Sequence, residues 1–239
     1  MYFIKKLAIF IFDIIDKYIH QKNILKNLKK ENISIEIFLD IGAHEGKYTD
    51  LIIKNYKIKK IYMFEPQPKF FKIIQNKYKK QNKINILNYA ISNKNEKKIL
   101  YINKHNLTSS IKKLNSQNKY LNIKSKLFGT NLKGMIEKKI LIKTVTLKNF
   151  FLKEKISNID LIKIDTEGHE YEVLIGLGDK IKLIKSILIE FHNNQTYLGY
   201  NSKKIEQLLK KNKFILKKTI KFPFTTWEDR IYTNNIIRT

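Results

Sequence analysis

Apolar residues recur along the chain in two alternating patterns. Short runs that are apolar nearly throughout, such as residues 159–165, are typical of buried strands in a parallel sheet. Longer stretches with apolar residues three and four positions apart, such as residues 48–56, predict amphipathic helices. This alternation predicts an α/β fold, with a mostly parallel sheet covered by helices on both faces.

The same patterns give approximate bounds for each element. The runs that predict strands are residues 35–40, 61–64, 84–91, 98–102, 140–145, 159–165, 186–191, 214–221 and 229–234. The runs that predict helices are residues 48–56, 68–78, 147–152, 167–177 and 202–212. Residues 112–138 are polar and fit neither pattern. Because a long loop inside a compact domain is usually functional or disordered, we expect a partly helical lid or substrate segment there.

The N-terminal segment predicts a further amphipathic helix over residues 3–20. A helical wheel gathers its polar residues on one side: Lys6, Asp13, Lys17 and His20. We therefore expect residues 1–30 to form a helical extension that docks on a main domain of residues 31–239.

The apolar run at residues 7–12 is far too short to span a bilayer, and no signal-peptidase cleavage pattern follows it. The sequence therefore predicts no transmembrane segment and a cytoplasmic location. Weak peripheral contact of the N-terminal helix with a membrane is the alternative.

The large net charge of the chain is weak evidence for a nucleic-acid partner. The net charge is +27, but only Arg230 and Arg238 among the 48 basic residues are arginines. Recognition of phosphates and bases favours the planar arginine side chain. Lysine, isoleucine and asparagine are abundant together and share A/T-rich codons, so a genomic bias explains the charge better than a nucleic-acid partner does. The chain has no cysteine, which excludes disulfides, cysteine-based zinc sites and a cysteine nucleophile.

A glycine-bearing turn follows the first predicted strand: Asp40-Ile-Gly-Ala-His-Glu-Gly46. Such a turn lets a ligand approach the backbone and the helix N-terminus, and a carboxylate ending the next strand, here Glu65, can bind ribose hydroxyls. The dinucleotide fingerprint would need another glycine where this chain has His44. Since Asp40 suits an ammonium group, the pattern favours S-adenosylmethionine over NAD. An NAD-dependent dehydrogenase remains a further alternative.

This interpretation predicts a cofactor site made by the turn and the end of the second strand: Asp40, Gly42, Ala43, His44, Gly46 and Glu65. A second polar segment ends the strand at residues 159–165 and reads Lys163-Ile-Asp-Thr-Glu-Gly-His-Glu170. Ligands of open α/β sheets bind beyond the carboxyl ends of strands. Acids that stabilise a helix N-terminus would explain Glu167 and Glu170, but explain Asp165 and His169 less well.

Together these segments resemble the FkbM-type methyltransferases. The motifs of that family read approximately Asp-hydrophobic-Gly-Ala-Asn-x-Gly, Glu-Pro, Ser-Ser-Leu and Lys-Ile-Asp-x-Glu-Gly-His-Glu. This chain carries the two segments above together with Glu65-Pro66 and Ser109-Ser110-Ile111, in the same order, over residues 38–191. It departs from the pattern at His44, where asparagine is usual, and at Ile111.

The resemblance implies a Rossmann-like class I methyltransferase fold, with seven strands of which the last is antiparallel. It implies that Asp40, Gly42, Gly46 and Glu65 bind S-adenosylmethionine and that Asn88 to Ala90 border the adenine. It also implies an acceptor hydroxyl on a sugar, a glycan or another small molecule. An RNA methyltransferase or another nucleic-acid-binding protein stays as the alternative that the basic charge suggests.

Methyl transfer needs an aligned acceptor and a group that removes the hydroxyl proton. His169 and Asp165 are both candidates for that base. We expect it to be His169, with Asp165 and Glu167 in an orienting role. A Mg²⁺ ion held by Asp165, Glu190 and His192 is the alternative. We expect residues 105–138 and 192–200 to determine acceptor specificity, and Tyr197 and Tyr200 are candidates for the lining of the acceptor pocket.

Overall fold

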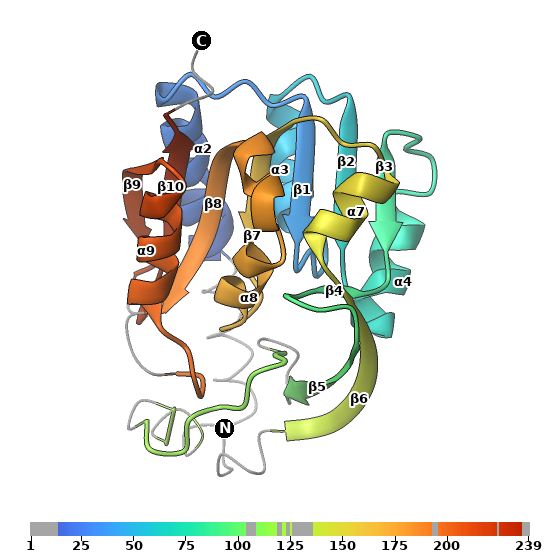
Figure 1. Ribbon diagram of the computed structural model, residues 1–239, viewed down its shortest axis with the longest axis vertical. Coiled ribbons are helices and arrows are strands. Elements are labelled where there is room, and N and C mark those ends of the chain that lie inside the picture. The colour runs from blue at the N-terminus through green and yellow to red at the C-terminus, as the bar shows by residue number, and fades with distance from the viewer. Residues whose placement is uncertain are drawn as a thin grey trace.

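A computed structural model describes residues 14–103, 109–118, 121, 122, 125, 136–192, 196–223 and 225–235 of the protein. Its centre is a seven-stranded sheet with the order β3-β2-β1-β7-β8-β10-β9 (Figure 1). The strands are β1 (Ile37–Ile41), β2 (Lys60–Phe64), β3 (Ile84–Leu87), β7 (Ile159–Ile164), β8 (Ile184–His192), β9 (Phe214–Lys221) and β10 (Trp227–Asn234). Within this sheet β10 alone runs opposite to the other six strands: it pairs antiparallel with β8 and β9, whereas β1, β2, β3, β7 and β8 pair in parallel. The predicted mostly parallel sheet with an antiparallel last strand is confirmed.

Helices cover both faces of this sheet (Figure 1). One face carries α2 (Gln21–Lys30), α3 (Lys47–Asn55) and α4 (Pro68–Lys77), and the other carries α7 (Leu147–Lys153), α8 (Glu170–Ile175) and α9 (Ser202–Lys211). Successive strand residues point to opposite faces. Phe38 therefore packs in the apolar core under α2 and α3, whereas Leu39 packs in the core under α7, α8 and α9. The 3₁₀-helix η2 (Gly178–Leu183) leads from α8 to β8.

Two predicted elements have different bounds in the structure. Helix α8 begins at Glu170, later than the predicted residue 167, because Glu167 and Gly168 adopt φ angles of 54° and 94° that a right-handed helix excludes. The predicted strand over residues 84–91 is divided, since β3 ends at Leu87 and the chain then leaves the main sheet.

The residues that leave the main sheet start a second, smaller one. In it β4 (Ala90–Ile91) pairs in parallel with β6 (Ile136–Val145), which pairs antiparallel with β5 (Lys97–Asn103). This sheet extends beyond the carboxyl ends of β1, β7 and β8, on the side where parallel α/β sheets bind their ligands (Figure 1).

The N-terminal prediction is only partly met. Residues 1–13 lie outside the described part of the chain. The π-helix η1 (Asp16–His20) continues directly into α2, so the helical segment reaches Lys30. The placement of His20 on a polar, solvent-facing side was wrong. His20 is 1% exposed and its Nε2 lies 2.7 Å from Asp229 Oδ2 on β10, between the rings of Phe222 and Trp227. A hydrogen bond to a distant strand overrides the helical-wheel pattern.

The division into an extension of residues 1–30 and a domain of residues 31–239 stays a prediction. Among the residues that the structure describes, no helix combines the length and the apolar character that a membrane crossing requires.

Strand β9 forms one edge of the main sheet. Ile215 and Leu216 are 43% and 45% exposed on it, and Lys218 and Lys221 are exposed beside them. The opposite edge is β3.

Candidate active site

The turn between β1 and α3 is held tightly against its neighbours. The backbone N–H groups of Gly42 and Ala43 both donate to the Phe64 carbonyl, at 3.0 and 3.1 Å. A Cβ on Gly42 would lie 1.9 Å from the Asp165 carbonyl oxygen, and one on Gly46 would lie 2.6 Å from the Tyr78 hydroxyl. We expected these glycines to make room for a ligand. In the structure the protein's own close packing requires both.

His44 occupies a backbone position that explains its identity. Its φ is 48°, in the left-handed region where asparagine, aspartate and histidine are enriched. This is the position where the FkbM pattern has asparagine, so either residue can adopt the turn. The imidazole packs on the Phe70 ring, with ring centres 3.6 Å apart, and the backbone N–H donates to Glu65.

Asp40 is fully buried at the end of β1. Its Oδ2 accepts a hydrogen bond from Thr49 Oγ1 at 2.7 Å, whereas Oδ1 is buried and has no hydrogen-bond partner among the described residues. Burial raises the pKa of Asp40, although the charge of Lys163 and the bond from Thr49 oppose this shift. Asp40 thus presents one unsatisfied acceptor at the start of the glycine turn.

Glu65, at the end of β2, is hydrogen-bonded to the same turn. Its Oε2 accepts from the backbone N–H of His44 and its Oε1 from that of Gln67, both at 2.8 Å. The residue is 4% exposed. Burial raises its pKa to about 7, despite the two N–H donors. Asn88 lies directly behind it, since the Asn88 side-chain amide donates to the Glu65 carbonyl at 2.9 Å, and Ala90 follows as a buried residue of β4.

The loop after β7 is organised around two acids. Asp165 Oδ2 accepts from the buried Lys163 Nζ at 2.9 Å. Burial opposes ionisation, but the Lys163 charge and hydrogen bonds from Lys163 and Glu190 lower the pKa of Asp165. Glu170 Oε1 accepts from the backbone N–H groups of Thr166 and Gly168, each at 3.0 Å, and so fixes the loop that carries Glu167.

Two distant segments complete this loop. Ser110 Oγ donates to the Glu167 carbonyl oxygen, which connects the Ser-Ser-Ile motif to the last motif. The Tyr197 hydroxyl donates to Glu167 Oε2, and the Tyr197 ring fills the space where Gly168 lacks a Cβ, 2.5 Å from that position. Tyr197 is only 2% exposed, so in this arrangement it supports Glu167 rather than offering an open face.

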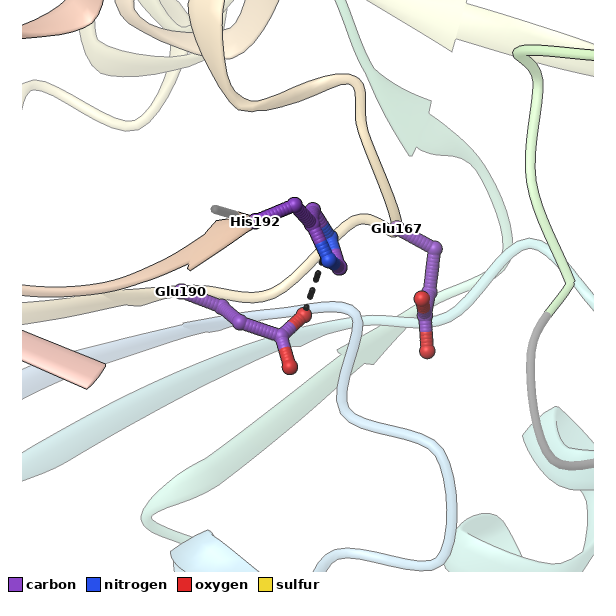
Figure 2. A group of neighbouring side chains, drawn as sticks. All are labelled: Glu167, Glu190 and His192. Carbon is purple, nitrogen blue, oxygen red and sulfur yellow. Dashed lines mark ion pairs between the residues drawn. The ribbon is translucent and has the colours of Figure 1, made fainter. Parts of the chain in front are cut away.

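A cluster of three side chains lies where β7 and β8 end. Glu167, Glu190 and His192 each direct one ligand atom into a group whose members are all within 4.8 Å of one another (Figure 2). Glu190 Oε2 and His192 Nε2 are 3.5 Å apart. Burial, reinforced by Asp165 and Glu167, raises the pKa of Glu190 well above its usual value. Burial lowers the pKa of His192 to about 4.

His169 lies apart from this cluster. It is 2% exposed, its Nε2 is 3.0 Å from Ser92 Oγ, and its Nδ1 is 3.5 Å from Glu172 Oε2. Burial lowers its pKa to about 4, and the charges that also act on it are those of Glu172, Lys112 and Lys98. The structure therefore brings Glu167 to Glu190 and His192, hydrogen-bonds Asp165 to Lys163 and Glu190, and turns His169 toward Ser92. The role of His169 as the base stays a prediction.

The sequence matches the family model of the methyltransferase FkbM domain over residues 40–216, which is most of the chain. The protein belongs to the FkbM methyltransferase family. No curated protein matches the sequence.

Three solved structures are similar to this FkbM-family chain. A methyltransferase FkbM from Methylobacillus flagellatus has a TM-score of 0.52 at 14% identity, over 84% of this chain and 43% of that one. M. capricolum TrmK in complex with S-adenosyl-homocysteine has a TM-score of 0.46 at 14% identity, over 84% and 62% of the two chains. Magnesium protoporphyrin IX methyltransferase from Synechocystis with bound S-adenosylmethionine has a TM-score of 0.49 at 10% identity, over 92% of this chain and 78% of that one.

The chain thus spans 43% and 62% of the lengths of the first two. The strand order and the similarity to the FkbM structure confirm the predicted class I methyltransferase fold.

The two segments expected to determine acceptor specificity in this FkbM-family protein meet beside the cluster. Leu114 and Tyr197 form an isolated β-bridge, Asn115 N donates to the Thr196 carbonyl at 2.9 Å, and Leu198 N donates to the Lys113 carbonyl at 2.8 Å. Much of the predicted lid lies outside the described residues. The sequence analysis missed the roles of Lys163 and Ser110. Lys163 could have been noticed in the sequence, because a charged residue between Ile162 and Ile164 in a buried strand needs a partner.

Proposed function

We propose that the protein transfers a methyl group from S-adenosylmethionine to a hydroxyl group of a sugar, a glycan or another small molecule. Family membership supports methyl transfer. The observation that carries the cofactor assignment is Asp40: a fully buried carboxylate with one unpartnered oxygen, at the start of a glycine turn that also contacts Glu65.

The residues of this edge fit the proposed cofactor. An ammonium group would satisfy Asp40 Oδ1, since a buried acceptor without a donor is unfavourable. Each oxygen of Glu65 accepts one backbone hydrogen bond and retains a lone pair for a ribose hydroxyl. The turn residues from Gly42 to Gly46 would hold the cofactor, and Asn88 and Ala90 would border its adenine. When bound, S-adenosylmethionine supplies an electrophilic methyl group on sulfur.

The remaining tasks are alignment of the acceptor oxygen and removal of its proton. The cluster of polar groups near the carboxyl ends of β7 and β8 supports assigning both tasks to this edge, where Asp165 and Glu167 would orient the acceptor. The hydrogen bond of His169 to Ser92 supports a positioning role for His169. We therefore propose that the proton is removed near the ends of β7 and β8 rather than by the predicted His169.

Isothermal titration calorimetry on the purified protein tests the cofactor assignment. We expect S-adenosylmethionine and S-adenosylhomocysteine to bind and NAD not to bind. Asp40→Asn should weaken both affinities at least about tenfold, the scale of one lost charge-assisted hydrogen bond. Asp179→Asn is the matched control, because Asp179 is 53% exposed and pairs with Lys148 on the surface. Binding of NAD alone would contradict the assignment.

Transfer of labelled methyl groups tests the acceptor class. We expect label to appear on sugars or nucleotide sugars as base-stable ethers. Label on RNA instead would support the alternative that the charge of +27 suggests. A cytoplasmic location and weak membrane contact of the N-terminal helix stay predictions.

A further inference from the structure

The side chains at the ends of β7 and β8 have the composition of a cation site. Glu167 comes from the loop after β7, and Glu190 and His192 come from alternate positions at the end of β8 (Figure 2). Alternate residues of a strand point to the same face. Each side chain contributes one atom to a group no wider than 4.8 Å. The three atoms therefore surround one point, and small side-chain shifts would bring an ion there to usual ligand distances of about 2.0–2.2 Å from each of them.

Two of these atoms have no other partner. Glu190 Oε2 and His192 Nε2 are buried and make no hydrogen bond within the described part of the chain. The side chains of Glu190 and His192 are only 9% and 6% exposed. The 3.5 Å between the two atoms is longer than a hydrogen bond. Buried polar atoms are normally satisfied, so a pair of unpartnered atoms aimed at one point indicates a missing ligand.

Lys163 is not the missing partner of Glu190 Oε2 and His192 Nε2. Lys163 Nζ lies 2.9 Å from Asp165 Oδ2 and 4.2 Å from the centre of the Tyr48 ring. Asp165 is therefore already neutralised. This pairing changes the ligand set expected from the sequence, in which Asp165 stood where the structure places Glu167.

Surrounding contacts hold the three side chains in place. The Tyr197 hydroxyl donates to Glu167 Oε2 and so fixes the orientation of the Glu167 carboxylate. The His192 ring stands edge-on to Tyr197 and Tyr200, with ring centres 5.0 and 5.3 Å away, and its backbone N–H donates to the Tyr200 hydroxyl at 2.9 Å. Metal sites depend on such outer contacts, which fix the orientation of the ligands.

We propose that Glu167, Glu190 and His192 bind one divalent first-row transition-metal ion, such as Mn²⁺ or Fe²⁺. Two carboxylates and one imidazole suit these ions better than Mg²⁺ or Ca²⁺, which prefer oxygen ligands alone. Three protein ligands leave coordination positions open. In a role that rests on the proposed function, an open position receives the acceptor hydroxyl, orients it and lowers its pKa.

Titration of Mn²⁺ into chelator-treated, tag-free, full-length protein tests the site, with free Mn²⁺ followed by electron paramagnetic resonance. We expect one bound Mn²⁺ per chain. Glu190→Gln and His192→Gln should each weaken binding at least tenfold. Glu154→Gln, an exposed position at the end of α7, is the matched control and should leave binding unchanged. Zn²⁺ should compete for the same position.

A spectroscopic readout identifies the ligand directly. Bound Mn²⁺ should show electron spin-echo modulation from an imidazole nitrogen, and His192→Gln should abolish it. Retention of the nitrogen signal in His192→Gln would overturn the proposal. So would the absence of stoichiometric Mn²⁺ and Zn²⁺ binding, or equal binding in Glu190→Gln and the wild type.

Binding of S-adenosylhomocysteine to the same metal-free samples separates this inference from the proposed function. It also verifies that each variant is folded. Should S-adenosylhomocysteine bind while Mn²⁺ and Zn²⁺ do not, only the cation site fails. Should Mn²⁺ bind in the absence of any cofactor binding, the cation site holds and the proposed function fails.

Discussion

The carboxyl edge of the sheet consists of two regions that differ in how their polar groups are satisfied. At the ends of β1 and β2, backbone N–H groups of the adjoining chain hold both oxygens of Glu65, and one oxygen of Asp40 has no hydrogen-bond partner among the described residues. At the ends of β7 and β8, side chains hold one another, and two buried atoms, on Glu190 and His192, keep no partner. Backbone donors are fixed by the fold, whereas side chains can rearrange around a ligand. The first region is therefore a preformed binding site, whereas the side chains of the second region can rearrange around a ligand.

The largest effect is expected from a substitution at the point where the two regions contact each other. Gly42 has φ +84°, and its missing Cβ would lie 1.9 Å from the Asp165 carbonyl. We expect Gly42→Ala to lower the free energy of unfolding by about 4 kcal/mol or more, because backbone strain and overlap add. Urea denaturation measures this loss.

Gly178→Ala is the control, because Gly178 also has a positive φ of 54° but meets only a lysine side-chain carbon at 3.3 Å. It should cost about 1–2 kcal/mol, the left-handed backbone penalty alone. Equal losses in the two variants would show that the contact between the regions is not tight.

The pH dependence of stability tests whether His169 is buried as a neutral side chain. Burial lowers its pKa from 6.5 to about 4. A group whose pKa is depressed in the folded state contributes stability that is fully present above pH 6.5 and is lost as the pH falls through about 4. We expect the stability advantage of the wild type over His169→Gln to shrink by about 3 kcal/mol across that window. An advantage that stays constant with pH would contradict this environment.

A substitution confined to the first region sharpens the comparison. Thr49→Val removes the hydroxyl that donates to Asp40 Oδ2 and leaves both oxygens of a buried carboxylate unpartnered. We expect a loss of about 2 kcal/mol in unfolding free energy, as for a hydrogen bond to a charged group. Mn²⁺ binding should not change. Thr219→Val on the edge strand β9 is the control and should alter stability by less than about 0.5 kcal/mol.

The smallest effect belongs to the second region. Tyr197→Phe removes the hydrogen bond to Glu167 without changing the packing of the ring on Gly168. We expect a loss of about 1 kcal/mol in stability and a severalfold weaker Mn²⁺ affinity. Binding of S-adenosylhomocysteine should be unaffected. Tyr18→Phe, at a 51% exposed position, should change none of these quantities. Weaker cofactor binding in Tyr197→Phe would indicate that the regions are not separable.

The two regions also differ in how much of them was predictable. Asp40, the glycine turn and Glu65 follow one another within 26 residues, so a local motif describes them. The cluster draws on Ser110, Glu167, Glu190 and Tyr197, which only tertiary folding brings together. The pairing of Lys163 with Asp165 was accessible, because residues two apart on a strand share a face. The pairing of His169 with Ser92, 77 residues away, was not.

The structure agrees with the hydrophobic pattern wherever the burial of one apolar face determines the position of a helix or strand. Strand and helix positions agree with prediction within a few residues over most of the chain. The pattern failed where a specific partner competed with it. His20 is buried by Asp229, and the run at residues 84–91 divides because its last two residues pair with β6 instead of continuing along β2.

The lysines of β9 have a consequence for how copies of the protein behave toward one another. An outer strand offers free backbone groups to any similar strand, and here it also shows apolar side chains at Ile215 and Leu216. Like charges at Lys218 and Lys221, within an overall +27, make two such edges repel. This protection is electrostatic, so concentrated salt shortens its range to a few ångströms. Purification at low to moderate ionic strength should therefore keep the protein dispersed, and salting should favour edge-to-edge aggregates.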